Sequence, residues 1–362
     1  MESITVSDVM GALAAIAPPA GAAEWDSVGL QIGDENAAVT RLGVCHDVTD
    51  AVVDRVAKEG VSMLIAYHPL ILGPLRRVVA GSGPAGRAFS LTREGVALAV
   101  VHTAFDVAAG GAADALADAL QIEEAVGFAP VGAAGGLKLV TFLPEEHVDG
   151  VAGAMAAAGA GRIGGYTGCS FRSVGVGAFE APAGANPAVG RAGEANREPE
   201  VRLEMACEVS VRDRVVAALM AAHPYERPAF DLYERQGDPG MLGRVGRWVG
   251  TLEELADLAG DVLGPAVRVA GEPGARLEIV AVAPGSGGDL VAAAKAAGAD
   301  ALVTGDVKHH AARRALEMGL AIVDPGHAAS ERPGVATLYS AATRIIDDVV
   351  DLTGLDADPW GV

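Results

Sequence analysis

Short apolar runs alternate with stretches of helical periodicity along the first third of the chain. The runs are bounded by polar, Gly or Pro residues and have the length of buried strands. Such alternation favours a parallel sheet covered by helices on both faces. In chain order the predicted elements are a helix at Thr5–Ile16, a strand at Leu42–Cys45, a helix at Thr49–Lys58, strands at Ser62–Ala66 and Val96–Val101, and a helix at Gly110–Leu120.

The middle third has a different pattern, in which alternating strands come in pairs. Its order, β-α-β-β-α-β, is that of a ferredoxin-like unit, which can form a domain of its own. A Gly-rich turn at Gly161–Tyr166, a polar connection at Ala181–Pro199 and an exit linker at Gly237–Gly240 punctuate it. The predicted elements are strands or helices at Leu137–Leu143, Glu145–Ala158, Ser170–Phe179, Val201–Val209, Val211–Ala222 and Ala229–Tyr233.

The last third returns to strand–helix alternation. Strands are predicted at Ile279–Ala283, Ala301–Val303 and Leu320–Val323, with helices at Asp289–Ala297 and up to Met318 between them. The sequence therefore predicts an α/β protein with a two-part αβα core and a ferredoxin-like α+β domain inserted in the middle. We expect residues 1–134 to form the first part of the core, 135–240 the insert, and 241–362 the second part.

Composition narrows the class of protein. With 51% apolar and 20% charged residues, the chain of 362 residues has enough apolar side chains for a substantial core. A net charge of −20 disfavours nucleic acid and anionic membranes as main partners. The three cysteines show no CxxC spacing, no secretory signal is visible at Met1, and no apolar run is long enough to span a bilayer. We expect a soluble, cytoplasmic protein.

Candidate metal ligands follow three of the predicted strands. His68 lies in a Tyr67-His68-Pro69 corner, and His102 comes directly after Val96–Val101. His102 and Asp106, and again His327 and Glu331, are spaced i, i+4, which places each pair on one face of a helical turn. Imidazole and carboxylate together suit a hydrolytic Zn, Mn or Fe centre. If the three segments converge at the carboxyl ends of the strands, they predict such a site.

Each of these residues also has a structural interpretation. His68 before a proline is compatible with a turn histidine, and Asp106 with a helix cap. Pro333 predicts that any helix after His327 begins late, because proline is tolerated only in a first turn. Cys45-His46 is more typical of a strand end than of a metal ligand.

Two glycine-containing motifs in the last third are also ambiguous. Gly285-Ser286-Gly287-Gly288 could cradle an anion on its backbone N–H groups, although a tight strand-to-helix turn is the commoner role. Asp306, in Thr304-Gly305-Asp306, is predicted to cap the following helix. Of His309 and His310, adjacent on that helix, only one can face a site.

Taken together, these motifs resemble a known family over nearly the whole chain. The chain is similar to the GTP cyclohydrolase I type 2-like proteins, the homologues of a yeast interacting factor, in their long form with a CutA/PII-like inserted domain. The motifs that carry the resemblance in the core are Trp25–Gly33, Tyr67–Leu70, His102–Asp106, Thr304–His310 and Gly326–Arg332, and those in the insert are Gly161–Tyr166, Cys169–Phe171, Gly184–Pro187 and His223–Glu226.

The resemblance implies a dinuclear metal centre and a toroidal hexamer. Carried over by position, the metal ligands are His68, Asp106, His327 and Glu331, and His102 is a ligand or an acid/base. Tyr67 departs from the family, which usually has His-His-Pro there. A phenol is a poor ligand for Zn or Mn, although Fe(III) binds phenolate well, so the site is expected to hold one or two divalent ions (Zn, Fe or Mn). The alternative role of Tyr67 is to donate a hydrogen bond to a metal-bound water or a phosphate.

The leading functional hypothesis is a metal-dependent hydrolase acting on a nucleotide or another phosphorylated small molecule. In it, Glu331 or His102 moves the proton, with Tyr67 as a further candidate catalytic group. The alternative is a non-enzymatic metal-binding, trafficking or ligand-sensing protein whose insert contacts a small ligand or partner, with assembly through trimers. A third interpretation is a degenerate member of the family that has kept only assembly, with Tyr67 marking the loss.

Overall fold

The computed structural model of the protein describes residues 4–131, 134–163, 166–236, 239–355 and 358–359. It divides into two compact units. The core unit comprises Met1–Gly132 and Pro239–Val362, and the insert unit comprises Ala133–Asp238. Residues 1–3, 164–165 of the predicted Gly-rich turn and 237–238 of the predicted exit linker lie outside the described residues. Within the described part, no helix combines the length and apolarity needed to cross a membrane.

The first sheet of the core unit has five strands in the order β1-β4-β3-β2-β15. Strands β2, β3, β4 and β15 are parallel, and β1 joins the edge antiparallel to β4. Every residue of β2, β3 and β4 is buried, as their unbroken apolar sequences predict. The bounds are β1 Gly29–Ile32, β2 Leu42–Cys45, β3 Met63–Ala66, β4 Ala97–Val100 and β15 Val349–Asp351.

Helices cover both faces of this sheet. Val9 and Leu13 of α1 and Phe105 of α4 pack on one face, while Val52 of α2 and Leu91 of α3 pack on the other. A Thr5 side chain caps α1 by accepting from the Asp8 N–H. The helices of this part are α1 Val6–Ile16, η1 Pro19–Gly21, α2 Asp50–Glu59, α3 Gly83–Arg93, α4 His102–Val107 and α5 Ala112–Ala119.

The second sheet has six strands in the order β11-β14-β13-β12-β10-β5. Its centre, β12, β13 and β14, is parallel, and the remaining pairs are antiparallel. The strands are β5 Glu123–Val131, β10 Gly240–Thr251, β11 Arg268–Ala270, β12 Arg276–Ser286, β13 Ala301–Gly305 and β14 Ala321–Asp324. The helices of the last third of the chain are α8 Leu252–Leu263, η4 Gly288–Leu290, α9 Val291–Ala296, α10 His309–Glu317, α11 His327–Ala342 and η5 Thr353–Leu355, of which η5 lies beside β2 of the first sheet.

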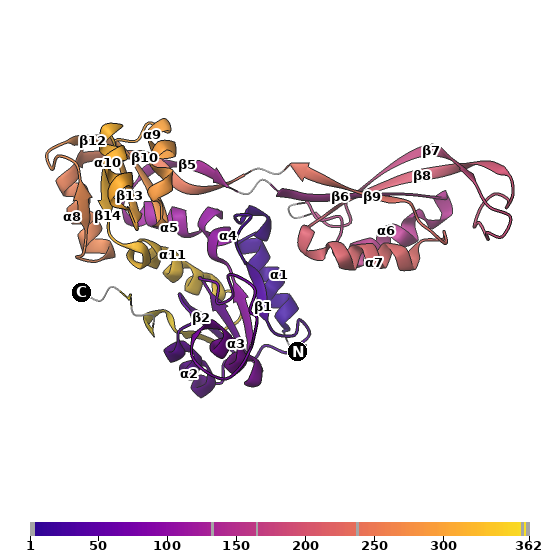
Figure 1. Cartoon of the computed structure of the whole chain (residues 1–362), viewed down its shortest axis with the longest axis horizontal. Coiled ribbons are helices and arrows are strands. Elements are labelled where there is room, and N and C mark those ends of the chain that lie inside the picture. Colours follow the sequence, from indigo (N-terminus) through magenta and orange to yellow (C-terminus); the bar gives the residue numbers. More distant parts are fainter. Residues whose placement is uncertain (1–3, 132–133, 164–165, 237–238, 356–357, 360–362) are drawn as a thin grey trace. The chain divides into compact units, whose positions relative to one another are not determined.

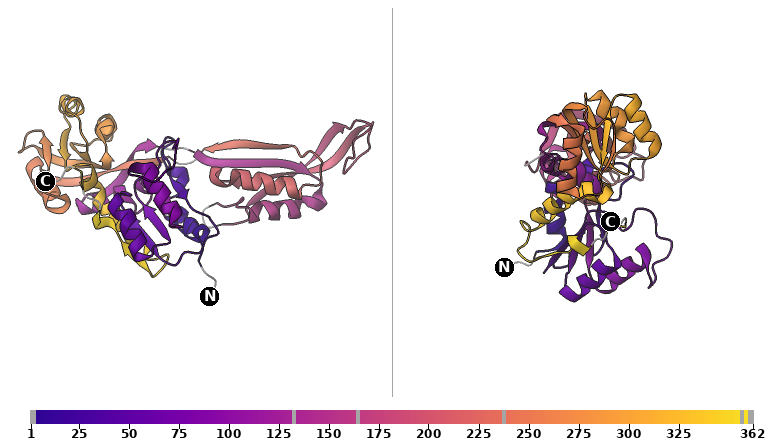
Figure 2. Two further views of the ribbon diagram at one scale, coloured as in Figure 1. Left: turned by 60° about the horizontal axis from the view of Figure 1, so that its bottom comes forward. Right: turned by 90° about the vertical axis from the view of Figure 1, so that its left-hand side faces the viewer.

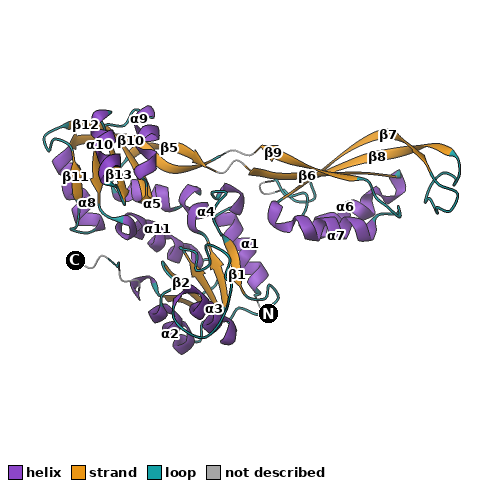
Figure 3. Cartoon of the chain, in the orientation of Figure 1, coloured by secondary structure: helices purple, strands orange, loops and turns teal. Residues whose placement is uncertain are grey.

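Helix α11 connects the cores of the two sheets. Its Ala329 packs in the core of the second sheet, whereas Val335 and Leu338 pack in that of the first. Figure 1 shows α11 between the strands of the two sheets, and Figure 3 shows the same arrangement by secondary structure. A residue near the start of α11 therefore lies where the two sheets approach each other.

The late start predicted for this helix is wrong, because α11 begins at His327 and contains Pro333. A proline there removes the hydrogen bond to the Ala329 carbonyl. Dense packing offsets that loss: a Cβ on the next residue, Gly334, would lie 2.5 Å from the Ala112 Cβ of α5.

The insert unit has a four-stranded antiparallel sheet in the order β7-β8-β6-β9. With two helices in the chain order β-α-β-β-α-β, this is the ferredoxin-like topology, so the predicted α/β core with a ferredoxin-like insert is confirmed. Figures 1 and 2 both show α6 and α7 side by side on one face of the sheet. The elements are β6 Ala134–Leu143, η2 Glu145–His147, α6 Val148–Ala157, β7 Ser170–Glu180, β8 Ala195–Cys207, η3 Val209–Val211, α7 Arg212–Ala222 and β9 Phe230–Gln236.

Candidate metal centre

Three neighbouring parallel strands of the first sheet end at the candidate site. His46 directly follows β2, and Tyr67 and His68 directly follow β3. His102 is the first residue of α4 and is separated from β4 by Val101 alone. Because carboxyl ends of parallel strands share one edge of the sheet, these side chains meet there. The ring centroids of His46 and His68 are 4.7 Å apart and nearly parallel, and those of His68 and His102 are 5.3 Å apart.

Glu331 of α11 joins these histidines from the other side. It is only 3% exposed. Its Oε2 lies 2.7 Å from His46 Nε2 and 3.3 Å from His68 Nε2. Its Oε1 lies 3.1 Å from His327 Nε2, one helical turn earlier on the same helix. Among the described residues, His46, His68 and Glu331 bring three candidate ligand atoms within 4.8 Å of one another.

Two further carboxylates orient the outer ring nitrogens. His68 Nδ1 lies 3.1 Å from Asp47 Oδ1, and His327 Nδ1 lies 2.8 Å from Asp306 Oδ2. Carboxylates in this position fix the ring orientation and the tautomer of metal-binding histidines. The result is that Nε2 of both rings faces Glu331.

The charges of this cluster are strongly coupled. Burial alone would raise the pKa of Glu331, but the hydrogen bonds from His327, His46 and His68 hold it well below its usual range. Burial would lower the pKa of His68, yet Asp47 and Glu331 raise it to about 10. Glu331 likewise raises the pKa of His327 to about 9, against the opposite effect of burial. Without a metal ion, protons on the imidazoles therefore balance the buried carboxylate.

Tyr67 and Asp106 form a separate buried pair beside the histidines. The Tyr67 hydroxyl donates a hydrogen bond to Asp106 Oδ1, and the tyrosine ring is fully buried. Burial raises the pKa of Asp106 to about 7, despite the bond from Tyr67, and burial and the charge of Asp106 raise the pKa of the phenol. Tyr67 thus occupies one oxygen of a carboxylate that the sequence predicts to be a metal ligand.

His102 is held by a second buried acid. Its Nδ1 lies 2.8 Å from Asp26 Oδ1, and the Asp26 side chain is buried. Asp26 Oδ2 accepts hydrogen bonds from both the backbone N–H and the hydroxyl of Thr103. Burial would raise the pKa of Asp26, but the bonds from His102 and Thr103 lower it. Asp26 therefore orients the His102 ring, with Nε2 as the remaining nitrogen.

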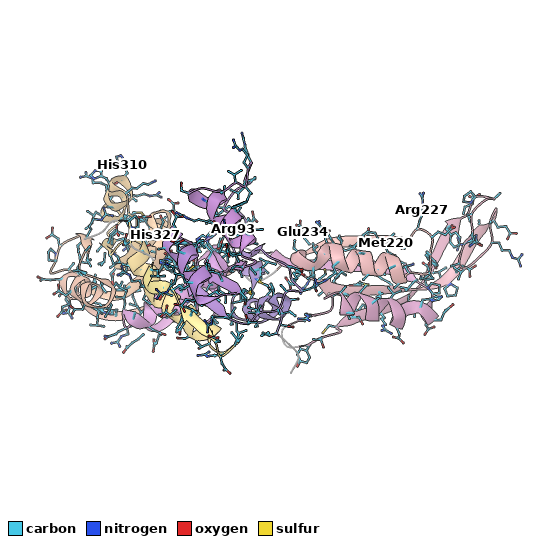
Figure 4. All side chains as sticks on the ribbon, turned by 90° about the horizontal axis from the view of Figure 1, so that it is seen from below. Arg93, Met220, Arg227, Glu234, His310 and His327 are labelled. Atoms are coloured by element: carbon cyan, nitrogen blue, oxygen red, sulfur yellow. The ribbon has the colours of Figure 1, made fainter. Side chains whose placement is uncertain are left out.

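All six residues that the sequence singles out lie in this one region, and His327 and Glu331 contact each other across one helical turn as their spacing predicts. Glu331 contacts His68 and His327, whereas Asp106 contacts Tyr67 and His102 contacts Asp26. The ring centroids of Tyr67 and His102 are 6.1 Å apart, and those of His68 and His327 are 5.5 Å apart. Figure 4 marks His327 at the start of α11.

Sequence reasoning missed His46, which it assigned to a strand end. The residue does follow β2, but its buried side chain contacts Glu331. The signal lies in the strand pairing, because His46 stands in the same position after β2 as Tyr67 does after β3, one strand away. Aligning the ends of neighbouring strands would have brought it into the site.

The predicted helix cap at Asp306 is wrong. The N-cap of α10 is Lys308, and Asp306, with a φ of 56°, turns its carboxylate towards His327. The turn Gly285-Ser286-Gly287-Gly288 also belongs to the site. A Cβ on Gly285, whose φ is +67°, would lie 2.5 Å from Glu331 Oε1. Only glycine fits this close approach of the backbone to the carboxylate.

The donor set fits a divalent metal ion. His46 and His68 each present Nε2 to the same carboxylate oxygen, and Glu331 is held ionised. Two imidazoles and a carboxylate are a frequent protein ligand set for catalytic zinc, and they suit iron and manganese as well.

Comparisons with known proteins agree with this architecture. The family model Duf34/NIF3 (NGG1p interacting factor 3) matches residues 4–353. The chain is 37% identical over 336 residues to a Bacillus subtilis protein named GTP cyclohydrolase 1 type 2 homolog, with 91% of this chain and 90% of that protein covered. A Mycobacterium tuberculosis protein of the same name is 38% identical over 340 residues, with 91% and 89% covered.

A solved structure shows the same fold. The crystal structure of a Bacillus cereus protein related to NIF3 superposes with a TM-score of 0.69 at 33% identity, covering 100% of both chains. The family model and the relatives span nearly the full length, including the strand ends that form the candidate metal centre. The chain therefore belongs to the Duf34/NIF3 family.

Proposed function

We propose that this protein is a metal-dependent hydrolase whose ion is held by His46, His68 and Glu331. The observation that carries the proposal is the position of two imidazole Nε2 atoms, 2.7 and 3.3 Å from one oxygen of a buried carboxylate. Zn, Fe and Mn all suit these ligands. A bound ion of this kind lowers the pKa of water towards neutrality and polarises a phosphoryl or carbonyl oxygen.

The neighbouring residues have roles that their hydrogen bonds define. Asp26 fixes Nδ1 of His102, which makes Nε2 the atom that would take a proton from, or give one to, the substrate. Tyr67 is protonated and bound to Asp106, so it would act as a hydrogen-bond donor and not as a base. Because the pKa of Glu331 is low, its main role would be that of a metal ligand, and it would be a weak proton acceptor.

A second ion beside the first would use the other side of Glu331. Its Oε1 faces His327 Nε2 at 3.1 Å, so Glu331 and His327 would both help to hold such an ion. Asp106 completes the set of His68, Asp106, His327 and Glu331 that the resemblance implies, once its bond with Tyr67 is broken. We propose that the His46 position is filled first, and that Tyr67 weakens the second position.

The proposed substrate is a nucleotide or another phosphorylated small molecule. The relatives' name, GTP cyclohydrolase 1 type 2 homolog, supports a nucleotide. With a net charge of −20, the chain would repel an anionic substrate except where a cation reverses the local sign. The metal centre would therefore be the attractive point for a phosphate group.

The test measures metal content and hydrolysis on the same preparations. Parent protein, Glu331→Gln and the control Glu317→Gln, an exposed residue at the end of α10, are analysed by plasma mass spectrometry and assayed with GTP and a simple phosphodiester. We expect Glu331→Gln to lose the bound ion and to hydrolyse the substrates at least about 100-fold more slowly than the parent. Glu317→Gln should match the parent in both metal content and rate. Equal rates in all three would refute the hydrolase.

Bound metal without hydrolysis of any substrate would favour the alternative role, metal binding or trafficking. The buried Tyr67–Asp106 pair is the observation that favours it, because it occupies a predicted ligand. Release of the ion to a chelator within minutes would then be expected.

A further inference from the structure

The insert unit has one sheet face that its helices do not cover. Along β8, Val201, Leu203 and Met205 are buried against α6 and α7. The alternate residues, among them Glu200 and Arg202, point to the opposite face, because successive side chains of a strand alternate. On that face, Phe142 of β6 pairs directly with Arg202.

A cavity of about 830 Å³ lies on this face, within the range of small-molecule sites. Phe142, Phe179 and Glu200 of the sheet line it. The β7–β8 connection, including Pro187 and Ala188, and the segment after α7, including Tyr225, form further parts of its wall. Arg227, another lining residue, extends away from the ribbon in Figure 4. Carbon predominates over polar atoms in this lining.

Local hydrogen bonds hold both wall segments in place. The Asn196 side chain accepts from the Arg191 N–H and donates to the carbonyls of Arg191 and Glu194, which ties the β7–β8 connection to the start of β8. On the other wall, His223 Nε2 lies 3.2 Å from the Phe142 carbonyl, and its Nδ1 accepts from the Tyr225 N–H. The cavity is therefore formed without a ligand.

One carboxylate, that of Glu200, stands out among the lining groups. Its Oε1 accepts a hydrogen bond of 2.6 Å from Tyr225, whose pKa is raised by burial and by Glu200, so the phenol stays a donor. Gly177 leaves room for the other oxygen, since a Cβ there would lie 2.1 Å from Oε2.

Glu200 differs from Glu204, a nearby carboxylate on the same face of β8, in having no ion pair with a lysine or arginine among the described residues. Glu204, two positions along the same face of β8, pairs with Lys138 at 2.8 Å and Arg202 at 2.7 Å. In the described part of the chain, no lysine or arginine forms an ion pair with Glu200. A half-buried carboxylate that forms no ion pair with a lysine or arginine, in a cavity lined mainly by carbon, suits a ligand that brings N–H donors or positive charge.

We propose that this cavity binds a small molecule with a flat aromatic ring and an amidine-like pair of N–H donors. The ring would lie against Phe142, Phe179 and Tyr225, and the donors would bond to Glu200. This site lies in the insert unit and uses none of the residues of the metal centre. A test of this cavity is therefore independent of the proposal that the protein is a hydrolase. It would give the insert a ligand-binding role.

The experiment uses benzamidine, a flat amidinium, and benzoate, an anion of matched size, as probes of the full-length chain. Binding is titrated by saturation-transfer NMR for the parent, Glu200→Gln, the matched control Glu204→Gln, and Ala188→Trp, which fills the cavity from an exposed position. Circular dichroism checks that each variant unfolds at the parent temperature.

We expect benzamidine to bind the parent and the Glu204→Gln control equally, to bind Glu200→Gln at least about tenfold more weakly, and not to bind Ala188→Trp. Benzoate should not bind the cavity. The proposal is overturned if benzamidine fails to bind the parent, if benzoate binds as well as benzamidine, if the two Gln variants weaken binding alike, or if Ala188→Trp has no effect.

Discussion

His46 and Tyr67 lie edge to face at the ends of two neighbouring strands, with ring centroids 5.3 Å apart and planes inclined by 79°. The family resemblance leads one to expect histidine at position 67, where this chain has a phenol bound to Asp106. An imidazole is nevertheless present, supplied by the next strand of the sheet. The end of β2 therefore places an imidazole beside the phenol at the end of β3.

If His46 is a ligand, its removal should release metal. We expect His46→Ala to retain less than about a tenth of the ion that the parent holds after dialysis, because two donors bind a divalent ion poorly. Metal content by plasma mass spectrometry is the readout. The control is His310→Ala, an exposed histidine on α10 (Figure 4). An unchanged ion content in His46→Ala would show that position 46 does not bind metal.

Metal affinity should rise with pH. His68, with a pKa of about 10, and His327, with a pKa of about 9, are protonated at pH 7 in the metal-free protein. Since an imidazole must lose its proton to bind a metal, each ligating histidine of this pair releases one proton. Glu331 releases none, because its pKa is already low.

The slope of log affinity against pH between 6 and 8 therefore reports which histidines bind. Calorimetry in buffers of different ionisation enthalpy measures the same proton count. A slope near one indicates that His68 binds and His327 does not, and a slope near two indicates that both bind. An affinity that falls or stays constant as the pH rises would contradict the predicted coupling.

Gly285 should be essential to the position of Glu331. Gly285→Ala forces a Cβ to within 2.5 Å of Oε1 and strains a backbone with a φ of +67°. We expect metal affinity to drop about 10–100-fold, the range found when groups supporting a metal ligand are disturbed. Gly274→Ala, at a position with nothing within 4 Å, is the control. Similar affinities for both variants would rule out this role.

Asp26 should contribute to folding as well as to orientation of His102. An asparagine has fewer acceptors and would leave Thr103 or His102 without its partner, so Asp26→Asn should lower the free energy of unfolding by about 1–3 kcal/mol. Denaturant unfolding compares it with Asp54→Asn, an exposed position on α2. A loss no larger than in Asp54→Asn would show that these bonds add no net stability.

The sequence predicted the positions of the buried parallel strands correctly, but apart from His327 and Glu331 it did not predict which polar side chains contact one another. Unbroken apolar runs such as Leu42–Cys45 identify buried parallel strands, and residues after them reach one edge. Which side chain contacts Glu331 depends on the pairing of strands, which no local pattern encodes. His46 was missed for this reason. The prediction from Pro333 was wrong for another reason. The low helix propensity of proline was overridden by the packing of α11 between two sheets.

His46 and Glu331 are separated by 285 positions along the chain, with the whole insert unit between them. An ion bound to both would act as a cross-link that closes a very long loop and ties the first third of the core unit to the last. Because the ion would bind only the folded core, its free energy of binding would add to the stability of that unit. The insert unit has its own apolar core and no part in this link. Chelation should therefore lower the melting temperature of the core unit and leave that of the insert unit unchanged.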